Sequence, residues 1–181
     1  MGGRRTLKES VYVGLLRGVN VGGTNKLAMA DLRSLFEDLG FSGVRTFIQT
    51  GNVVFASGHQ PASLALEAAI AQRFGIETDV VLRSSSELGG VVAANPFPHD
   101  LARSVHVGFM ARAPGQAALE ALEPERFEAE RFAVVGTEAY VYLPAGVGPS
   151  KLPAYLARRL GTPITFRNWS TVNRLLELSA G

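Results

Sequence analysis

Hydrophobic and polar positions change period several times along the first half of the chain. Residues 11–17 form an apolar, β-branched run, and a Gly-rich segment follows to residue 26, which predicts a strand and then a loop. Apolar side chains then recur at the i, i+3, i+4 and i+7 spacing of an amphipathic helix, at Leu32, Leu35, Phe36 and Leu39. Gly40 stands where a left-handed residue ends a helix, and Phe41 is placed to close that cap.

The next segment predicts a β-hairpin. Residues 46–48 and 53–55 are β-branched or aromatic, and between them lies the polar segment 49–52, whose glycine suits a turn that needs a positive φ. A second helix is predicted over residues 61–74, ended by Gly75 and followed by a strand over residues 78–82. The order of elements in the first half is therefore βαββαβ.

The second half repeats this order. The segment SVYVGLL at residues 10–16 is echoed by SVHVGFM at residues 104–110, and VVLR at residues 80–83 by ITFR at residues 164–167. The expected elements are a strand at 105–111, a helix at 114–122, a hairpin at 131–143, a helix at 150–160 and a strand at 164–166. Each half closes with a short helix.

A βαββαβ unit of this size is typical of the ferredoxin-like arrangement, in which an antiparallel sheet carries both helices on one face. We therefore expect an α+β protein made of duplicated ferredoxin-like subdomains. Pro96 and Pro98 remove backbone donors and prevent a helix from continuing. The break between the halves is placed there, with a first subdomain over residues 1–96 and a second over residues 97–181.

The amino-acid composition excludes several classes of functional site. The chain has 181 residues, of which 46% are apolar, and 18 Lys and Arg against 16 Asp and Glu, which is typical of a soluble globular protein. Because it has no cysteine, it has no disulfide, thiolate metal site, iron–sulfur cluster or cysteine nucleophile. The formal charge of +2 is too small to attract nucleic acid at long range. No apolar run has the length of a signal peptide or a membrane span, so we expect a cytoplasmic protein without a membrane partner.

Residues 12–55 closely resemble the bacterial DUF1697 family. The resemblance rests on RGVNVGG at residues 17–23, an acidic and leucine-bearing helix over residues 31–39, and QTGNV at residues 49–53. The segment RNWSTV at residues 167–172 also resembles the family's Arg-Asn-Trp-x-Thr ending, so the likeness extends over nearly the whole chain. The resemblance implies a two-part ferredoxin-like fold and a biochemical function that is unassigned.

The Gly-rich loop is the main candidate for a binding site. It joins a strand to a helix, where free backbone N–H groups and the helix dipole favour an anion, and Arg17 and Lys26 add positive charge at its two ends. Gly18 and Gly23 are spaced as in a phosphate-binding P-loop, but Thr24 occupies the lysine position, which argues against a Walker-type NTPase. In the alternative reading, the glycines serve a tight turn and Asn20 and Asn25 bond the loop to itself.

Two further segments contribute candidates. The hairpin tip at residues 49–52 offers amide and hydroxyl groups to a polar ligand. At the other end of the chain, Asn168 is placed to cap the final helix and Trp169 to pack on the core; alternatively, Arg167 and the indole N–H reach the first-half loop and complete a composite pocket. The candidate ligand-binding residues are Arg17, Gly18, Asn20, Gly22, Gly23, Lys26, Gln49, Asn52, Arg167 and Trp169.

The sequence assigns no reaction. His59, His99 and His106 have no metal-ligand spacing, so we expect no metal site, and neither a catalytic residue nor a cofactor is identified. The leading hypothesis is binding of a small anionic ligand, such as a nucleotide or a phosphorylated metabolite. The alternative is a nucleic-acid-binding or protein-interaction module, although the middle strands lack the aromatic residues of RNA-recognition modules. Whether the chain is an enzyme and whether it forms oligomers are left open.

Overall fold

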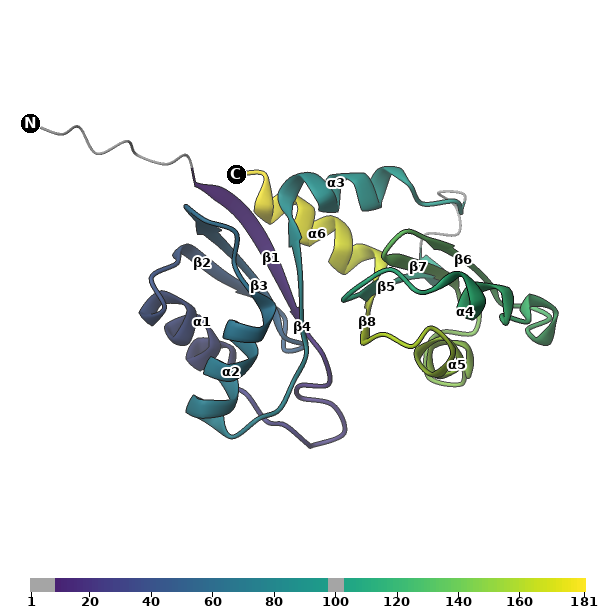
Figure 1. The fold of residues 1–181 in the computed structure, drawn as a ribbon, viewed down its shortest axis with the longest axis horizontal. Helices are drawn as coiled ribbons and strands as arrows, with labels where there is room; N and C mark the ends of the chain where they lie inside the picture. Colours follow the sequence, from purple (N-terminus) through teal and green to yellow (C-terminus); the bar gives the residue numbers. More distant parts are fainter. Residues whose placement is uncertain (1–8, 98–102) are drawn as a thin grey trace, which may run out of the picture. The chain divides into compact units, whose positions relative to one another are not determined.

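The computed structural model describes residues 9–97 and 103–181, so His99 lies outside the described residues. The first half contains β1 (Ser10–Leu16), α1 (Met29–Asp38), β2 (Ser42–Phe47), β3 (Asn52–Ser57), α2 (Ser63–Phe74) and β4 (Val80–Ser84). Its four strands form an antiparallel sheet in the order β2-β3-β1-β4. Figure 1 shows α1 and α2 together on one face of this sheet. The predicted ferredoxin-like arrangement is therefore confirmed for this half.

The second half repeats the topology. It contains β5 (Val105–Met110), α4 (Gln116–Glu120), the short 3₁₀ helix η2 (Pro124–Arg126), β6 (Arg131–Val135), β7 (Glu138–Tyr142), α5 (Leu152–Arg159) and β8 (Ile164–Asn168). The strands form a second antiparallel sheet in the order β6-β7-β5-β8. The closing helices are α3 (Ser85–Ala93) after the first sheet and α6 (Trp169–Ser179) after the second. The predicted duplication of an α+β unit is confirmed.

The core of the first half follows from the alternation of its strands. One set of alternate strand residues packs against the apolar stripes of α1 and α2; this cluster includes Leu16, Val53, Phe55, Leu32, Phe36, Leu66 and Ile70, all buried. Burying side chains of this size is the main favourable contribution to folding. The same packing places the end of β1 and the start of β3 at one edge of the core, where the candidate site begins.

The end of α1 has the cap that the sequence predicts. Gly40 has a φ of 88°, and its N–H donates to the Glu37 carbonyl, while the Phe41 N–H donates to the Phe36 carbonyl. This is the Schellman pattern, and the accompanying apolar contact joins the rings of Phe36 and Phe41, whose centroids are 5.7 Å apart. Gly75 ends α2 in the same left-handed conformation.

Several predicted boundaries shift. The strand expected to start at residue 78 starts at Val80, because Thr78 and Asp79 bond to Arg17 instead. The strand expected at residue 46 begins at Ser42, and Ile48 leaves it with a φ of 48°. The helix expected over residues 114–122 is limited to Gln116–Glu120, with Gly115 at its N-cap and a 3₁₀ turn following at Pro124.

Packing divides the chain into two compact units, residues 1–86 with 178–181, and residues 87–177. The predicted division between residues 96 and 97 follows the repeated pattern, whereas the compact units follow contacts. Most of α3 belongs to the second unit, where the Tyr140 hydroxyl donates to the Val91 carbonyl at 2.7 Å. The last residues belong to the first unit, where Arg45 Nη2 donates to the Gly181 carbonyl at 3.2 Å.

No helix in the described ranges combines the length and the apolar character needed to cross a lipid bilayer.

Candidate functional site

The Gly-rich loop is a miniature hairpin. The Asn20 N–H donates to the Asn25 carbonyl at 3.0 Å, and Val21 and Thr24 form an antiparallel bridge. Between them, Gly22 and Gly23 have φ values of 58° and 80°, the two successive positive values that a tight primed turn requires. The reading in which the glycines serve a tight turn is confirmed.

Asn20 ties this loop to the rest of the unit. Its φ is 54°, and its Nδ2 donates to the carbonyls of Leu27 at 2.8 Å and Gln49 at 2.7 Å. Its Oδ1 accepts from the Leu27 N–H at 2.8 Å. Asn25 adds an internal bond, from its Nδ2 to the Gly18 carbonyl at 3.1 Å. Both asparagines therefore hold the loop in one shape, as the alternative reading of the sequence predicts.

The hairpin tip lies against the same loop. The Leu16 N–H donates to the Gly51 carbonyl at 2.8 Å, and a Cβ added to Gly51 would lie 2.5 Å from Val19 Cγ2. Asn52 is fully buried and donates to the Phe47 carbonyl at 3.0 Å and to Thr50 Oγ1 at 2.9 Å. The structure thus brings the loop and the hairpin tip together, and it uses Asn52 to hold the turn.

The two positively charged side chains of the loop, Arg17 and Lys26, differ in their ion-pair partners. Arg17 Nη1 lies 2.9 Å from Asp79 Oδ2, and both side chains are partly exposed, at 49% and 37%. The Arg17 backbone also joins the segment before β4, because Thr78 Oγ1 donates to its carbonyl at 2.7 Å. Lys26 is exposed and has no ion-pair partner among the residues that the structure describes. One positive charge is therefore balanced by a carboxylate, and the other is open to solvent.

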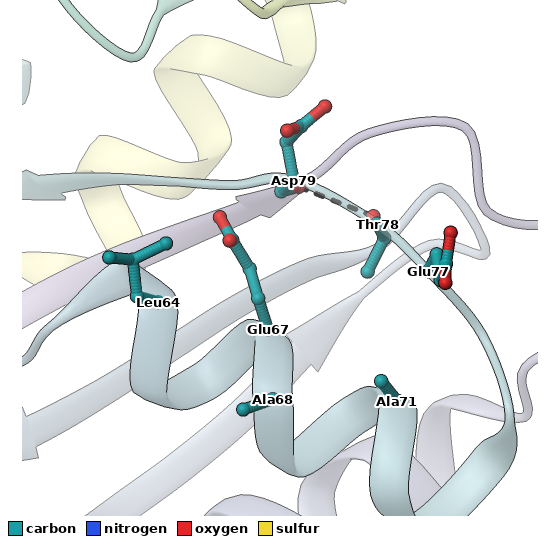
Figure 2. Close-up of a pocket in the computed structure, with 7 residues that line it drawn as sticks. All are labelled: Leu64, Glu67, Ala68, Ala71, Glu77, Thr78 and Asp79. Atoms are coloured by element: carbon teal, nitrogen blue, oxygen red, sulfur yellow. Dashed lines mark hydrogen bonds between the residues drawn. The ribbon is translucent and has the colours of Figure 1, made fainter.

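Asp79 also lines an acidic groove (Figure 2). It measures about 480 Å³, and its lining consists of Leu64, Glu67, Ala68, Ala71, Glu77, Thr78 and Asp79. Glu67 extends from α2, and its Oε1 accepts from the Val80 N–H at 2.9 Å. Sequence reasoning missed the groove because its carboxylates come from a helix and from the segment before β4, with no shared motif. In the described residues, no cluster of three or more His, Cys, Asp or Glu is arranged to hold a metal ion.

The candidates of the second half are mostly used inside their own unit. Arg167 is buried, and its Nη1 donates to Thr165 Oγ1 at 2.7 Å and to the Phe166 carbonyl at 2.9 Å. Burial lowers the pKa of Arg167 to about 10, so the guanidinium remains charged at neutral pH.

The junction after β8 confirms the structural reading of the sequence. Asn168 Oδ1 accepts from the Thr171 N–H at 2.8 Å and caps α6, while Trp169 is only 9% exposed. The approach of Arg167 and Trp169 to the first-half loop stays a prediction.

The ten candidate residues therefore fall into two groups. Arg17, Gly18, Gly22, Gly23, Lys26 and Gln49 are exposed around the loop and hairpin tip. Asn20 is half-buried and Asn52, Arg167 and Trp169 are buried; the polar groups of the first three hold the backbone or neighbouring side chains. A ligand at the loop would meet the exposed group, while Asn20 and Asn52 support the loop and the hairpin tip.

Comparisons with known proteins agree with the resemblance in the sequence. The family described as "Protein of unknown function (DUF1697)" matches residues 10–140. Among solved structures, a conserved bacterial protein, SP0830 from Streptococcus pneumoniae, is similar with a TM-score of 0.68 and 26% sequence identity, over 94% of this chain and 99% of that one. No curated protein matches the chain. Because the family match extends over well over half of its length, the chain belongs to the DUF1697 family.

Proposed function

We propose that the chain binds a small anionic ligand, a nucleotide or a phosphorylated metabolite, in the cytoplasm, at the loop of residues 17–26 and the adjoining hairpin tip. The observation that carries the proposal is an exposed two-glycine turn in a loop that is held at its base by Asn20 and carries a cation at each end, Arg17 and Lys26. Within the described residues, the backbone N–H groups of Gly22 and Gly23 have no hydrogen-bond acceptor. Successive N–H groups of this kind are suited to an anion, and Arg17 and Lys26 add charge-assisted donors.

The hydrogen bonds that hold the loop favour ligand binding, because the loop loses less conformational entropy when the ligand binds. Three hydrogen bonds of the Asn20 side chain hold the base of the loop to Leu27 and to the hairpin tip before any ligand arrives. A site that is already ordered loses less conformational entropy on association. Gln49, whose carbonyl accepts one of these bonds, keeps its exposed side chain available to the ligand.

The Asp79 carboxylate sets the strength of this site. A ligand that binds Arg17 shares or displaces the Asp79 partner, whose ion pair is exposed enough to contribute about 1 kcal/mol or less. The exchange therefore costs little, but it lowers the affinity for any anion. The acidic groove on the other side of Asp79 disfavours anions by like-charge repulsion, so the ligand lies on the loop side of the pair.

The alternative nucleic-acid module is not favoured, because residues of the middle strands on the face that it needs are not exposed. RNA-recognition modules of this topology stack bases on the sheet face opposite the helices. On that face of the first sheet, Val13 and Leu15 are fully buried and Val54 is 1% exposed. On the second sheet, Val107 and Phe109 are fully buried.

Titration calorimetry with inorganic phosphate, pyrophosphate and adenosine monophosphate tests the proposal. We expect saturable binding of at least one probe, weakened about fivefold by Arg17→Ala and by Lys26→Ala, which corresponds to about 1 kcal/mol for each lost charge. The matched control is Arg33→Ala, which removes one exposed positive charge on α1 and leaves the loop intact. Equal weakening by the control, or no saturable binding of any probe, contradicts the proposal.

A further inference from the structure

The second unit contains a hollow that the proposed function does not use. It measures about 540 Å³ and lies between α5 and the segment of residues 126–130. On the α5 side, Lys151, Tyr155 and Arg158 line it, at the i, i+4 and i+7 spacing that places residues on one helix face. A volume of this size is in the usual range for small-molecule sites.

Three positively charged side chains line this hollow, and in the part of the chain that the structure describes none of them forms an ion pair with a carboxylate that lines it. Arg126, on the opposite wall, has its Cζ 5.6 Å from the centre of the Tyr155 ring, a cation–π contact that positions the guanidinium. Its ion-pair partner is Glu123, at 3.6 Å, which does not line the hollow. Lys151 and Arg158 have no ion-pair partner among the described residues. Three cations therefore line one small volume.

Two carboxylates of the described chain line the same hollow but do not pair with Lys151 or Arg158. Glu128 and Glu130 belong to the wall formed by residues 126–130, and in the described part of the chain neither lies within ion-pair distance of Lys151 or Arg158. Opposite charges thus line one hollow with space between them. Cations bind a phosphate group through charge-assisted hydrogen bonds, and carboxylates accept hydrogen bonds from hydroxyl groups.

We propose that this hollow binds a sugar phosphate, with Arg126, Lys151 and Arg158 holding the phosphate and Glu128 and Glu130 accepting from the sugar hydroxyls. An amino acid, which also carries both charges, is disfavoured because each of its carboxylates balances one cation, whereas a single phosphate dianion balances two. This site is separate from the proposed loop site, because all five residues belong to the second unit. Each proposal can therefore fail without the other.

The test is titration calorimetry on the full chain carrying Arg17→Ala and Lys26→Ala, the two changes expected to weaken the proposed loop site. The probes are glucose 6-phosphate, inorganic phosphate, glucose and glutamate. We expect glucose 6-phosphate to bind more tightly than each of the others. The double variant Lys151→Gln/Arg158→Gln should weaken it at least tenfold, on the order expected for two charge-assisted contacts.

Two further variants make the test specific. Arg112→Gln/Arg174→Gln removes the same charge from exposed positions of the second unit and should leave the affinity within twofold of the parent protein. Glu128→Gln/Glu130→Gln should reduce the preference for glucose 6-phosphate over inorganic phosphate at least threefold, because the hydroxyl acceptors are weakened while repulsion of the phosphate falls. The proposal is overturned by absent binding of glucose 6-phosphate, by equal loss in the control, by glutamate binding as tightly, or by an unchanged preference.

Discussion

Arg17 and Asp79 form an ion pair of 2.9 Å between Nη1 and Oδ2, although 62 positions separate them in the chain. The pair fastens the Gly-rich loop to the segment that leads into β4. Asp79 also lines the acidic groove, so one carboxylate separates a cationic loop from an acidic surface. The charge available to an anion at the loop therefore depends on both residues.

Gly51 is expected to tolerate no side chain. A Cβ there would lie 2.5 Å from Val19 Cγ2 and 2.7 Å from Leu16 Cβ, and its φ is 78°. We expect Gly51→Ala to lower the free energy of unfolding by about 2–5 kcal/mol, since an overpacked contact adds to the strain of a left-handed residue.

Gly40→Ala is the matched control for this prediction, because Gly40 has a φ of 88° and no atom within 4 Å of an added Cβ. It should cost about 1–2 kcal/mol, from conformation alone. Urea denaturation of both variants measures the difference. An equal loss of stability in the two would show that the contact of Gly51 with Leu16 and Val19 is unimportant.

Removal of the Asn20 side chain should loosen the loop from the hairpin tip. Asn20→Ala deletes three hydrogen bonds, each contributing about 1 kcal/mol, and places at a positive φ an alanine, which tolerates this conformation less well than asparagine, so we expect a loss of about 3 kcal/mol. Thr24→Ala, which deletes one exposed hydrogen bond to the Val21 carbonyl, should cost well under 1 kcal/mol. Similar midpoints of denaturation for the two variants would contradict this account of the loop.

His106 should make folding stability depend on pH. Burial lowers the pKa of His106 below the usual 6.5, and the hydrogen bond with the Ser104 backbone opposes this shift in part. Between the folded pKa and 6.5, the unfolded chain binds more protons than the folded chain, so stability falls as the pH drops below 6.5 and is fully present above it.

The measurement for His106 is urea denaturation at pH 7.5 and at pH 5.5. The wild-type chain should lose more stability between these two values than His106→Gln does, because the variant has no imidazole to protonate. Comparison of the two proteins cancels the contribution of every other titrating group. A loss of equal size in both would exclude His106 as the source of the dependence.

The features that the sequence predicts well are those set by neighbouring residues. The cap of α1 depends on Phe36, Gly40 and Phe41, which are close in the chain, and it forms as expected. The turn at Gly22 and Gly23 is equally local. The repeated βαββαβ order also follows from local periodicity, because each strand and helix must bury its own apolar face.

Contacts between residues that are far apart in the chain could not be predicted from the local sequence pattern. The bond from Asn20 to the Gln49 carbonyl spans 29 positions, and the pairing of Arg17 with Asp79 spans 62. Both require the sheet to place the end of β1 beside the hairpin tip and beside β4. The helix predicted over residues 114–122 is longer than α4, because the apolar pattern continues beyond Glu120 although the helix does not.

The most direct test of the proposed function is the affinity for one anionic probe in Arg17→Ala and in Asp79→Asn, measured by titration calorimetry at low salt. If the loop binds anions through Arg17, loss of the guanidinium should weaken binding about fivefold, and loss of the competing carboxylate should strengthen it by a similar factor. Changes of opposite sign at the two ends of one ion pair would support the account. A change of the same sign in both variants, or no change in either, would contradict it.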